Sequence, residues 1–340
     1  MEDIVSPEEA AEFLNPLRFY RHIAIAVSGG GDSMALMWLA SQWAGTTRQP
    51  PQLTVLTVDH GLRPEATGEA HWVVEAAGKL GLPAVMLAWQ GDKPVAGMQA
   101  RAREARYDLL IGWCIDHDAG ALVTAHSLDD QAETFMMRLA RGSGVDGLAG
   151  MRPMRDDKIA ILRPLLAVSG ARLRHTLLAA GQTWLEDPGN RDERFERVRW
   201  RKSLARLETE GLAPGMIALS ARRLERARLA LEHAALRLEA QVVAHAERHA
   251  TFPLAAIQGE PEDVVLRLLR RLIMRYGSGG EAPELAALER LGEWIALGVG
   301  GGRTLAGCRI TRRKDAVRIS REPPRRRHKQ ADAGTGKDYH

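Results

Sequence analysis

The 340-residue sequence has two cysteines, Cys114 and Cys308, which lie far apart along the chain. This argues against a disulfide framework and against a CxxC metal site, and it is typical of a reducing compartment. No run reaches the ~18 uncharged apolar residues of a membrane span. The acidic N-terminal stretch "MEDIVSPEEAAEF" has no apolar signal core. We therefore expect a cytoplasmic protein that does not interact with membranes.

A Walker A loop is also missing, because no GxxxxG is followed by Lys in the way that motif requires. The stretch "GSGVDG", residues 142–147, matches GxGxxG by letter. It follows a helical pattern and not a strand, so we interpret it as the end of a helix and a loop.

Charge is nearly balanced, with 47 basic and 43 acidic residues and a net charge of +4. Its distribution is uneven, since Arg and Lys gather in residues 191–228 and again in residues 312–329. Clustered arginine favours a polyanionic partner, although a solvated face or a disordered tail gives the same pattern.

The first half of the chain alternates short apolar runs with helix-length patterns. This alternation predicts an α/β fold with a doubly wound parallel sheet. The expected strands are residues 23–27, 53–58, 84–89, 121–125, 159–162 and 183–185, and the expected helices are residues 33–43, 65–80, 97–113 and 128–140.

The second half is expected to be a smaller, mainly helical domain. One long helix is predicted over residues 214–249, further helices over 261–276 and 283–297, and a hairpin within 304–320. We therefore divide the chain into a first, α/β domain (1–205), a second, mainly helical domain with a short terminal hairpin (206–320) and a basic, disordered tail (321–340).

The loop "SGGGDS", residues 28–33, lies between the first strand and the first helix. Glycines let the backbone approach an anion closely, and the N–H groups and dipole of a helix N-terminus favour phosphate. A carboxylate, Asp32, is unfavourable beside phosphate unless a cation intervenes, so we expect Mg²⁺ between Asp32 and a polyphosphate. A simple N-cap by Asp32 or Ser33 would not require three glycines.

This loop resembles the pyrophosphatase loop (PP-loop) of the N-type ATP pyrophosphatases. Four further stretches follow it in order: "VDHGLRPEA", "ARAREARYDLL", "TAHSLDDQAETFMMRLARGSG" and "WLEDPGNRDERFERVRWR". Together they resemble the tRNA(Ile)-lysidine synthetase family, strongly over residues 20–205 and more weakly beyond. The chain departs from the family pattern at Ser127, Gly189 and Val198.

The resemblance implies a ligase that uses ATP and Mg²⁺ to join L-lysine to C2 of the wobble cytidine in an isoleucine tRNA with a CAU anticodon. Asp130 and Glu133 fall on one helical face, where a carboxylate could bind the lysine ammonium and take its proton. The resulting candidates are catalytic Asp32, Arg103, Asp130 and Glu133; nucleotide-binding Ser28, Gly29, Gly30, Gly31, Asp32, Ser33, Asp59, His60 and His126; and substrate-binding Arg106, Glu186, Asp187, Asn190, Asp192, Arg197 and Arg201.

Three other functions stay open at this point. A tRNA thiolase would need cysteines for sulfur transfer or for an iron–sulfur cluster. A non-catalytic, nucleotide-sensing RNA-binding protein would not need the pair Asp130 and Glu133. A small-molecule amidotransferase-type ligase has no evident use for a large basic helical domain. The oligomeric state is open as well, with a homodimer among the alternatives.

Overall fold

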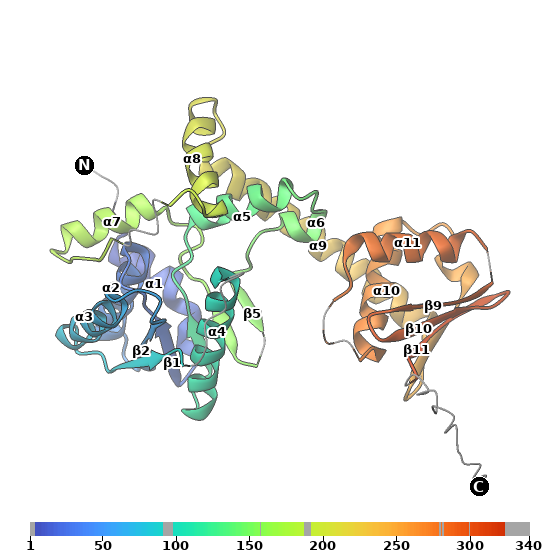
Figure 1. Cartoon of the computed structure of the whole chain (residues 1–340), viewed down its shortest axis with the longest axis horizontal. Helices are drawn as coiled ribbons and strands as arrows, with labels where there is room; N and C mark the ends of the chain where they lie inside the picture. Colours follow the sequence, from blue (N-terminus) through green and yellow to red (C-terminus); the bar gives the residue numbers. More distant parts are fainter. Residues whose placement is uncertain are drawn as a thin grey trace, which may run out of the picture. The chain divides into compact units, whose positions relative to one another are not determined.

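The computed structural model describes residues 4–90, 98–156, 158–186, 192–278, 280, 282–298 and 300–323. The chain forms two compact units, Met1–Glu225 and Arg226–His340 (Figure 1). Helix α9 (Pro214–Val242) begins in the first unit and ends in the second. The domain boundary predicted at residue 205 lies within helix α8 (Glu196–Thr209).

The first unit is built around a six-stranded sheet in the order β3-β2-β1-β4-β6-β5. All neighbours pair in parallel except β5 and β6, which are antiparallel at one edge. This is the doubly wound sheet that the alternating pattern predicts. The strands are β1 (His22–Ala26), β2 (Gln52–Asp59), β3 (Ala84–Ala88), β4 (Ala121–Val123), β5 (Met154–Asp156) and β6 (Ala160–Leu162).

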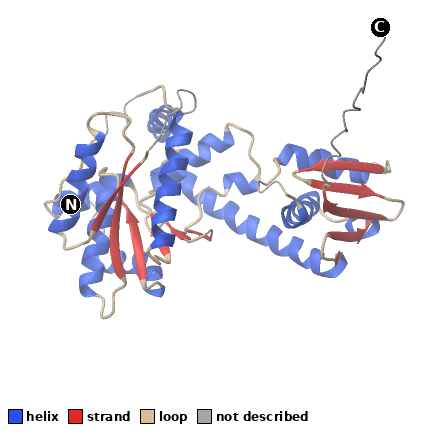
Figure 2. Ribbon diagram, turned by 60° about the horizontal axis from the view of Figure 1, so that its bottom comes forward, coloured by secondary structure: helices blue, strands red, loops and turns tan. Residues whose placement is uncertain are grey.

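Helices cover both faces of this sheet (Figure 2). Successive side chains of a strand point to opposite faces, so Ile23 and Ile25 join one apolar core while Ala24 joins the other. Burial on both faces explains why β1 reads as a continuous apolar run. The first core contains residues of α1 (Pro7–Leu14), α2 (Gly31–Thr46), α3 (Ala66–Lys79) and α7 (Gly170–Ala179), and the second contains residues of α4 (Met98–Asp116).

Helices α5 (Leu128–Leu139) and α6 (Val145–Leu148) follow β4, and α5 packs against α8. Helix α5 ends as expected before Gly142, but a short helix then follows from Gly144, which is its N-cap. None of the helices in the described residues is both long and apolar enough to cross a membrane.

The second unit contains a five-stranded antiparallel sheet in the order β7-β8-β11-β10-β9. Helices α10 (Glu262–Tyr276) and α11 (Leu285–Ala296) share one apolar core with its buried side chains. Buried and exposed residues alternate along β10, which is typical of a sheet covered on one face. The strands are β7 (Ala244–His245), β8 (His249–Pro253), β9 (Gly301–Leu305), β10 (Cys308–Arg312) and β11 (Ala316–Arg321).

The structure corrects three secondary-structure predictions. Residues 183–185 form no strand, because the N–H of Leu185 donates to the carbonyl of Gly29 at 2.9 Å instead of joining the sheet. The long helix ends at Val242, and the residues after it form β7 and β8. The predicted hairpin is part of the larger sheet, because β8 pairs with β11. Each correction depends on a partner distant in sequence.

Candidate active site

The candidate site lies where the strand order of the first sheet reverses. From β1 the chain passes outward to β2 and β3, and then crosses back to place β4 on the other side of β1. The loops after β1 and β4 diverge at such a point, and this is where ligands bind in open α/β sheets. Residues 28–33 follow β1 and residues 124–130 follow β4, so two of the predicted motifs meet here.

Gly29 is required at its position for two reasons. Its φ of +86° lies in the left-handed region that favours glycine. A Cβ there would also lie 3.0 Å from Leu185 Cδ1 and 3.3 Å from Val73 Cγ2. The segment around Leu185, which was expected to be a strand, therefore covers the loop and holds its shape.

Two hydroxyl groups support the loop from within. Ser33 Oγ donates to the carbonyl of Gly30 at 2.8 Å and accepts from the N–H of Ser28 at 3.2 Å. Gly30 is the N-cap of α2 and provides no side-chain cap. The N–H groups of the first turn are therefore available to an anion. Ser33 is buried and Ser28 exposed, so Ser33 shapes the loop and Ser28 presents a hydroxyl at its surface.

Asp32 stands in the first turn of α2 in an unfavourable electrostatic setting. Its Oδ1 is buried and makes no hydrogen bond within the described part of the chain. Arg174 Nη1, from α7, approaches Oδ1 only to 3.8 Å. Burial raises the pKa of Asp32, and the negative charges of Asp130 and Asp129 raise it further. The site is therefore short of positive charge.

The start of α7 brings further charged groups to Asp32. The N–H of Gly170 donates to Asp129 Oδ2 at 2.7 Å. A Cβ on Gly170 would lie 3.0 Å from Asp129 Oδ2 and 3.1 Å from both Asp32 Oδ1 and Arg174 Nη1. Our sequence analysis missed Asp129, Gly170 and Arg174. Ser169 is an ordinary N-cap, and nothing in the surrounding sequence indicates that this helix starts beside the loop.

These groups fit a magnesium ion that arrives with a nucleotide. Among the described residues, no three His, Cys, Asp or Glu side chains converge as an all-protein metal site. Magnesium is usually held by one or two carboxylates together with phosphate oxygens and water. Asp32 offers a carboxylate oxygen that lacks a hydrogen-bond partner in the described structure, which matches that requirement.

Asp130 and Glu133 lie together on α5, as predicted, but both are paired with α8. Arg201 Nε donates to Glu133 Oε1 at 2.7 Å. Arg197 lies 4.0 Å from Asp130 Oδ1 and 3.9 Å from Glu133 Oε2. The two arginines are one helical turn apart on α8, and the two carboxylates are one turn apart on α5. The four side chains therefore form a network of ion pairs between the two helices.

Glu133 and Asp130 differ in their access to solvent. The side chain of Glu133 is 1% exposed and that of Asp130 is 18% exposed. Burial raises the pKa of Glu133, while the charge and hydrogen bond of Arg201 act against that rise. In this arrangement Asp130 is the carboxylate that a ligand can reach, and Glu133 orients Arg201.

His126 and the loop after β2 complete the site edge. Thr124 Oγ1 and His126 Nδ1 are hydrogen-bonded at 2.9 Å. Burial lowers the pKa of His126 to about 4, so the imidazole is neutral at pH 7. Asp59 accepts a 2.6 Å hydrogen bond from the Thr67 hydroxyl, and His60 Nδ1 accepts one from the Leu62 N–H at 3.0 Å. Asp59 and His60 thus shape their own loop.

The remaining predicted residues are spread more widely. Arg103 lines a pocket on α4, Arg106 is exposed on the same helix, and Glu186 is exposed at the end of its segment. Asp192 is paired with Arg194 at 2.6 Å. Asp187 and Asn190 lie outside the described residues.

Two departures from the family pattern have structural roles. The N–H of Ser127 donates to Asp130 Oδ2 at 3.0 Å at the start of α5. Val198 is buried in α8. Gly189, the third departure, lies outside the described residues. The backbone of Ser127 therefore helps to orient the carboxylate that the site exposes.

Comparisons with known proteins show the family to which the chain belongs. Residues 4–208 match the family model described as PP-loop domain. The chain is 43% identical to a tRNA(Ile)-lysidine synthase of Bradyrhizobium sp., over 95% of this chain and 96% of that protein. It is 42% identical to one of Rhodopseudomonas palustris, over 95% and 97%, and 38% identical to one of Ruegeria pomeroyi, over 89% and 71%.

A solved structure supports the fold. The U34-tRNA thiolase NcsA from Methanococcus maripaludis, with its iron–sulfur cluster, superposes with a TM-score of 0.56 at 19% identity, over 65% of this chain and 77% of that one. At this identity the likeness concerns the fold alone. Fold and loop define a PP-loop protein, a class that uses ATP. Within that class, the chain belongs to the tRNA(Ile)-lysidine synthase family.

Proposed function

We propose that the protein ligates L-lysine to C2 of the wobble cytidine of isoleucine tRNA with a CAU anticodon. In the first step, cytidine O2 attacks the α-phosphorus of ATP and pyrophosphate leaves. In the second, the lysine ε-amine attacks C2, the C2–O2 bond breaks, AMP leaves and nitrogen loses a proton. The product is lysidine. The same proposal assigns this reaction to the cytoplasm.

The proposal rests mainly on one observation. The loops that follow β1 and β4 carry two of the predicted motifs, and they meet where the strand order of the first sheet reverses. The glycine loop with Asp32 stands on one side, and His126 and Asp130 stand on the other. A reaction that joins a nucleotide to a second substrate needs both within reach of one point. The family of the chain supports the same conclusion.

For adenylation, the loop binds the phosphates through the N–H groups of α2 and the Ser28 hydroxyl. Mg²⁺, when bound, would neutralise the charge that develops on the leaving pyrophosphate. Asp32 would hold that ion, and Arg174 would add a guanidinium beside the same oxygen atoms. The contact of Arg174 with the loop supports this role, because a Cβ on Gly31 would lie 3.1 Å from Arg174 Cγ.

For lysine transfer, the amine must lose a proton, since its ordinary pKa is about 10.4. Asp130 would bind the ammonium group and accept that proton. Glu133 would act with it by fixing Arg201, and the half-exposed guanidinium groups of Arg197 and Arg201 would bind the lysine carboxylate. Neutral His126, with Arg103 and Arg106, would contact the cytidine and its phosphates.

We also propose residues 206–320 as the tRNA-binding domain. Arg309 and Arg318 lie on one face of its sheet, and both are exposed in the described part of the chain. Arg309 lies directly opposite Thr304, and Arg318 directly opposite Thr251, which are hydroxyl residues of neighbouring strands. Guanidinium and hydroxyl groups on one sheet face suit phosphate contacts.

Sulfur transfer is less well supported than ligation. Cys114 and Cys308 are both buried, and they lie in different units of the chain. Burial raises the pKa of Cys114 to about 12 and that of Cys308 to about 11. Since the thiolate is the reactive form, neither thiol suits transfer chemistry.

The proposal is tested on an isoleucine tRNA transcript with a CAU anticodon, incubated with protein, Mg-ATP and lysine. Digestion and mass spectrometry should reveal cytidine joined to lysine, dependent on both ATP and lysine. The matched control exchanges the CAU anticodon for GAU, which has no wobble cytidine. If ATP is split to AMP but no lysine adduct forms, the ligase assignment is wrong and another acceptor must be sought.

A further inference from the structure

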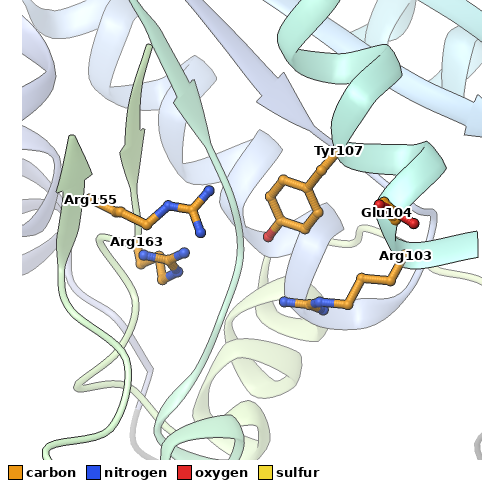
Figure 3. Close-up of a pocket in the computed structure, with 5 residues that line it drawn as sticks. All are labelled: Arg103, Glu104, Tyr107, Arg155 and Arg163. Atoms are coloured by element: carbon orange, nitrogen blue, oxygen red, sulfur yellow. The ribbon is translucent and has the colours of Figure 1, made fainter. Parts of the chain in front are cut away.

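Arginines gather near the candidate site in two places. Figure 3 shows Arg103, Arg155 and Arg163 around the ring of Tyr107, which forms a hydrogen bond with the Arg163 side chain. The other place is α7, whose two arginines each contact a carboxylate in a different part of the first unit. One of the two arginines of α7 has no role in the mechanism above.

The first half of α7 faces the candidate site. The N–H of Gly170 donates to Asp129 Oδ2 at 2.7 Å. Arg174 Nη1 lies 3.8 Å from Asp32 Oδ1. A Cβ on Gly31 would lie 3.1 Å from Arg174 Cγ, so the arginine stem also packs against the phosphate loop. A shift of α7 would therefore move the Arg174 guanidinium relative to that loop.

Arg172 joins the same helix to the N-terminal part of the chain. Its Nη2 donates to Glu9 Oε2 at 2.6 Å and to the carbonyl of Ile4 at 2.9 Å. The hydrogen bond from Arg172 lowers the pKa of Glu9, so this carboxylate is ionised at pH 7 and the contact is charge-assisted. Arg172 and Arg174 are about 200° apart around the helix axis, so they hold α7 from two sides.

A second polar contact joins the N-terminal segment to α7. Thr176 Oγ1 accepts the N–H of Val5 at 2.9 Å and donates to the carbonyl of Arg172 at 2.8 Å. Val5 is buried in the same apolar core as Leu173 and Leu177 of α7. The N-terminal segment therefore contacts α7 through both apolar packing and hydrogen bonds.

Glu9 links these contacts to the start of α1. The N–H of Ser6 donates to Glu9 Oε2 at 3.0 Å, and the N–H of Glu9 donates to Ser6 Oγ at 3.2 Å. The oxygen that accepts from Arg172 thus also caps α1. Helix α1 in turn packs against α2, whose first turn belongs to the phosphate loop.

We propose that residues 4–14 form a strap across α2 and α7, and that Arg172 and Glu9 are positioning residues for Arg174. The inference rests on the proposed function, in which Arg174 stands beside the leaving pyrophosphate. A group that stabilises developing charge must be held to within about 0.5 Å of its productive position. Arg172 would act through α7 and would not touch the nucleotide.

The experiment measures pyrophosphate release with Mg-ATP and the isoleucine tRNA transcript, at a temperature at which every variant is folded. Arg172→Gln should lower kcat by about tenfold or more and leave the KM for tRNA unchanged. Arg172→Lys keeps a charged donor for Glu9 and should recover part of the loss. The control is Arg18→Gln, because Arg18 donates to Asn15 at 3.2 Å within its own turn and should leave kcat at the wild-type value.

Double variants separate positioning from a general weakening of the fold. In an Arg174→Gln background, Arg172→Gln should cause no further loss of kcat, because the residue through which it acts is absent. Losses that multiply would overturn the inference. Glu9→Gln serves if Arg172→Gln fails to fold, since its amide oxygen can still accept from Ser6; it should lower kcat in the same direction, and only when Arg174 is present.

Failure of this inference can be told apart from failure of the proposed function. If the wild type forms lysidine while Arg172→Gln and Glu9→Gln keep its kcat, the strap assignment is wrong and the ligase assignment stands. If the wild type releases pyrophosphate but forms no lysidine, the ligase assignment is wrong, and the same comparison of kcat still tests the strap. A wild type that releases no pyrophosphate would overturn both.

Discussion

Asp32→Asn should make the protein more stable and inactive at the same time. Asp32 Oδ1 is buried without a hydrogen bond in the described structure, and two neighbouring carboxylates repel it. The substitution removes that charge and keeps the shape of the side chain. An amide N–H₂ can also donate to Asp129 or Asp130, where a carboxylate cannot.

The magnitude follows from two opposing effects. The lost ion pair with Arg174 is long at 3.8 Å and half-exposed, so it is worth about 0–1 kcal/mol. Relief of an unsatisfied, buried acceptor is worth about 1–3 kcal/mol. The net gain is about 1 kcal/mol, which corresponds to a rise in Tm of about 2–4 °C for a unit of this size.

The pH dependence has a definite sign. The folded-state pKa of Asp32 is raised, so the ionised side chain destabilises the fold above that pKa and has no effect below the ordinary value of 3.8. The stability advantage of Asp32→Asn should therefore be larger at pH 7 than near pH 4, and it should disappear below the ordinary pKa of 3.8. Urea denaturation at pH 7 and near pH 4 measures it, beside a pyrophosphate-release assay of adenylation.

Asp129→Asn is the matched control for this prediction. It removes the same charge, but Asp129 Oδ2 already accepts the N–H of Gly170 at 2.7 Å, so the variant should gain no stability. If Asp32→Asn is destabilised by more than about 1 kcal/mol at pH 7, or still forms the adenylate at the wild-type rate, the electrostatic reasoning is refuted.

Three further predictions concern other parts of the site and the core. Arg201→Ala should lower the free energy of unfolding by about 3 kcal/mol in urea denaturation, because the buried Glu133 loses its hydrogen-bonded partner and keeps only the longer contact with Arg197 at 3.9 Å. Glu133→Gln should recover most of this loss in the double variant, and additive costs would contradict the pairing. His126 has its pKa lowered to about 4 from 6.5, so the unfolded state binds more protons than the folded state between these values. The free energy of unfolding should therefore fall by about 3 kcal/mol as the pH drops through them, and His126→Gln should flatten this dependence. Native protein should not react with iodoacetamide at Cys114 or Cys308 at pH 8, and modification with loss of activity would favour thiol chemistry.

The first sheet shows why local patterns predicted so much of this fold. Strand β1 is a short apolar run with its central residues buried, and a glycine loop and a helix follow it directly. Periodicity and turn chemistry within about twenty residues specify such a unit. Local pattern was misleading for residues 183–185. Their composition also predicts a strand, but Leu185 packs against Gly29 instead and forms a hydrogen bond with its carbonyl.

Some residues of the candidate site could likewise be identified from the sequence, and others could not. Ser28, Gly29 and Asp32 could be identified from their own segment, because phosphate binding requires small residues between a strand and a helix. Arg174 and Gly170 could not be identified, because their segment has no unusual composition. Their proximity to Asp32 depends on α2 and α7 packing side by side on one face of the sheet.

The sequence by itself determined the alternating α/β order, the phosphate loop, the charge clusters and the resemblance to one family, since each resides in neighbouring residues or in ordered motifs. Only the tertiary structure decided what surrounds each charge. It pairs Glu133 with Arg201 through a hydrogen bond and leaves Asp32 Oδ1 without one among the described residues. It also buries the side chain of Arg163. Burial and pairing depend on elements distant in sequence, and these decide which charges are available for binding or chemistry.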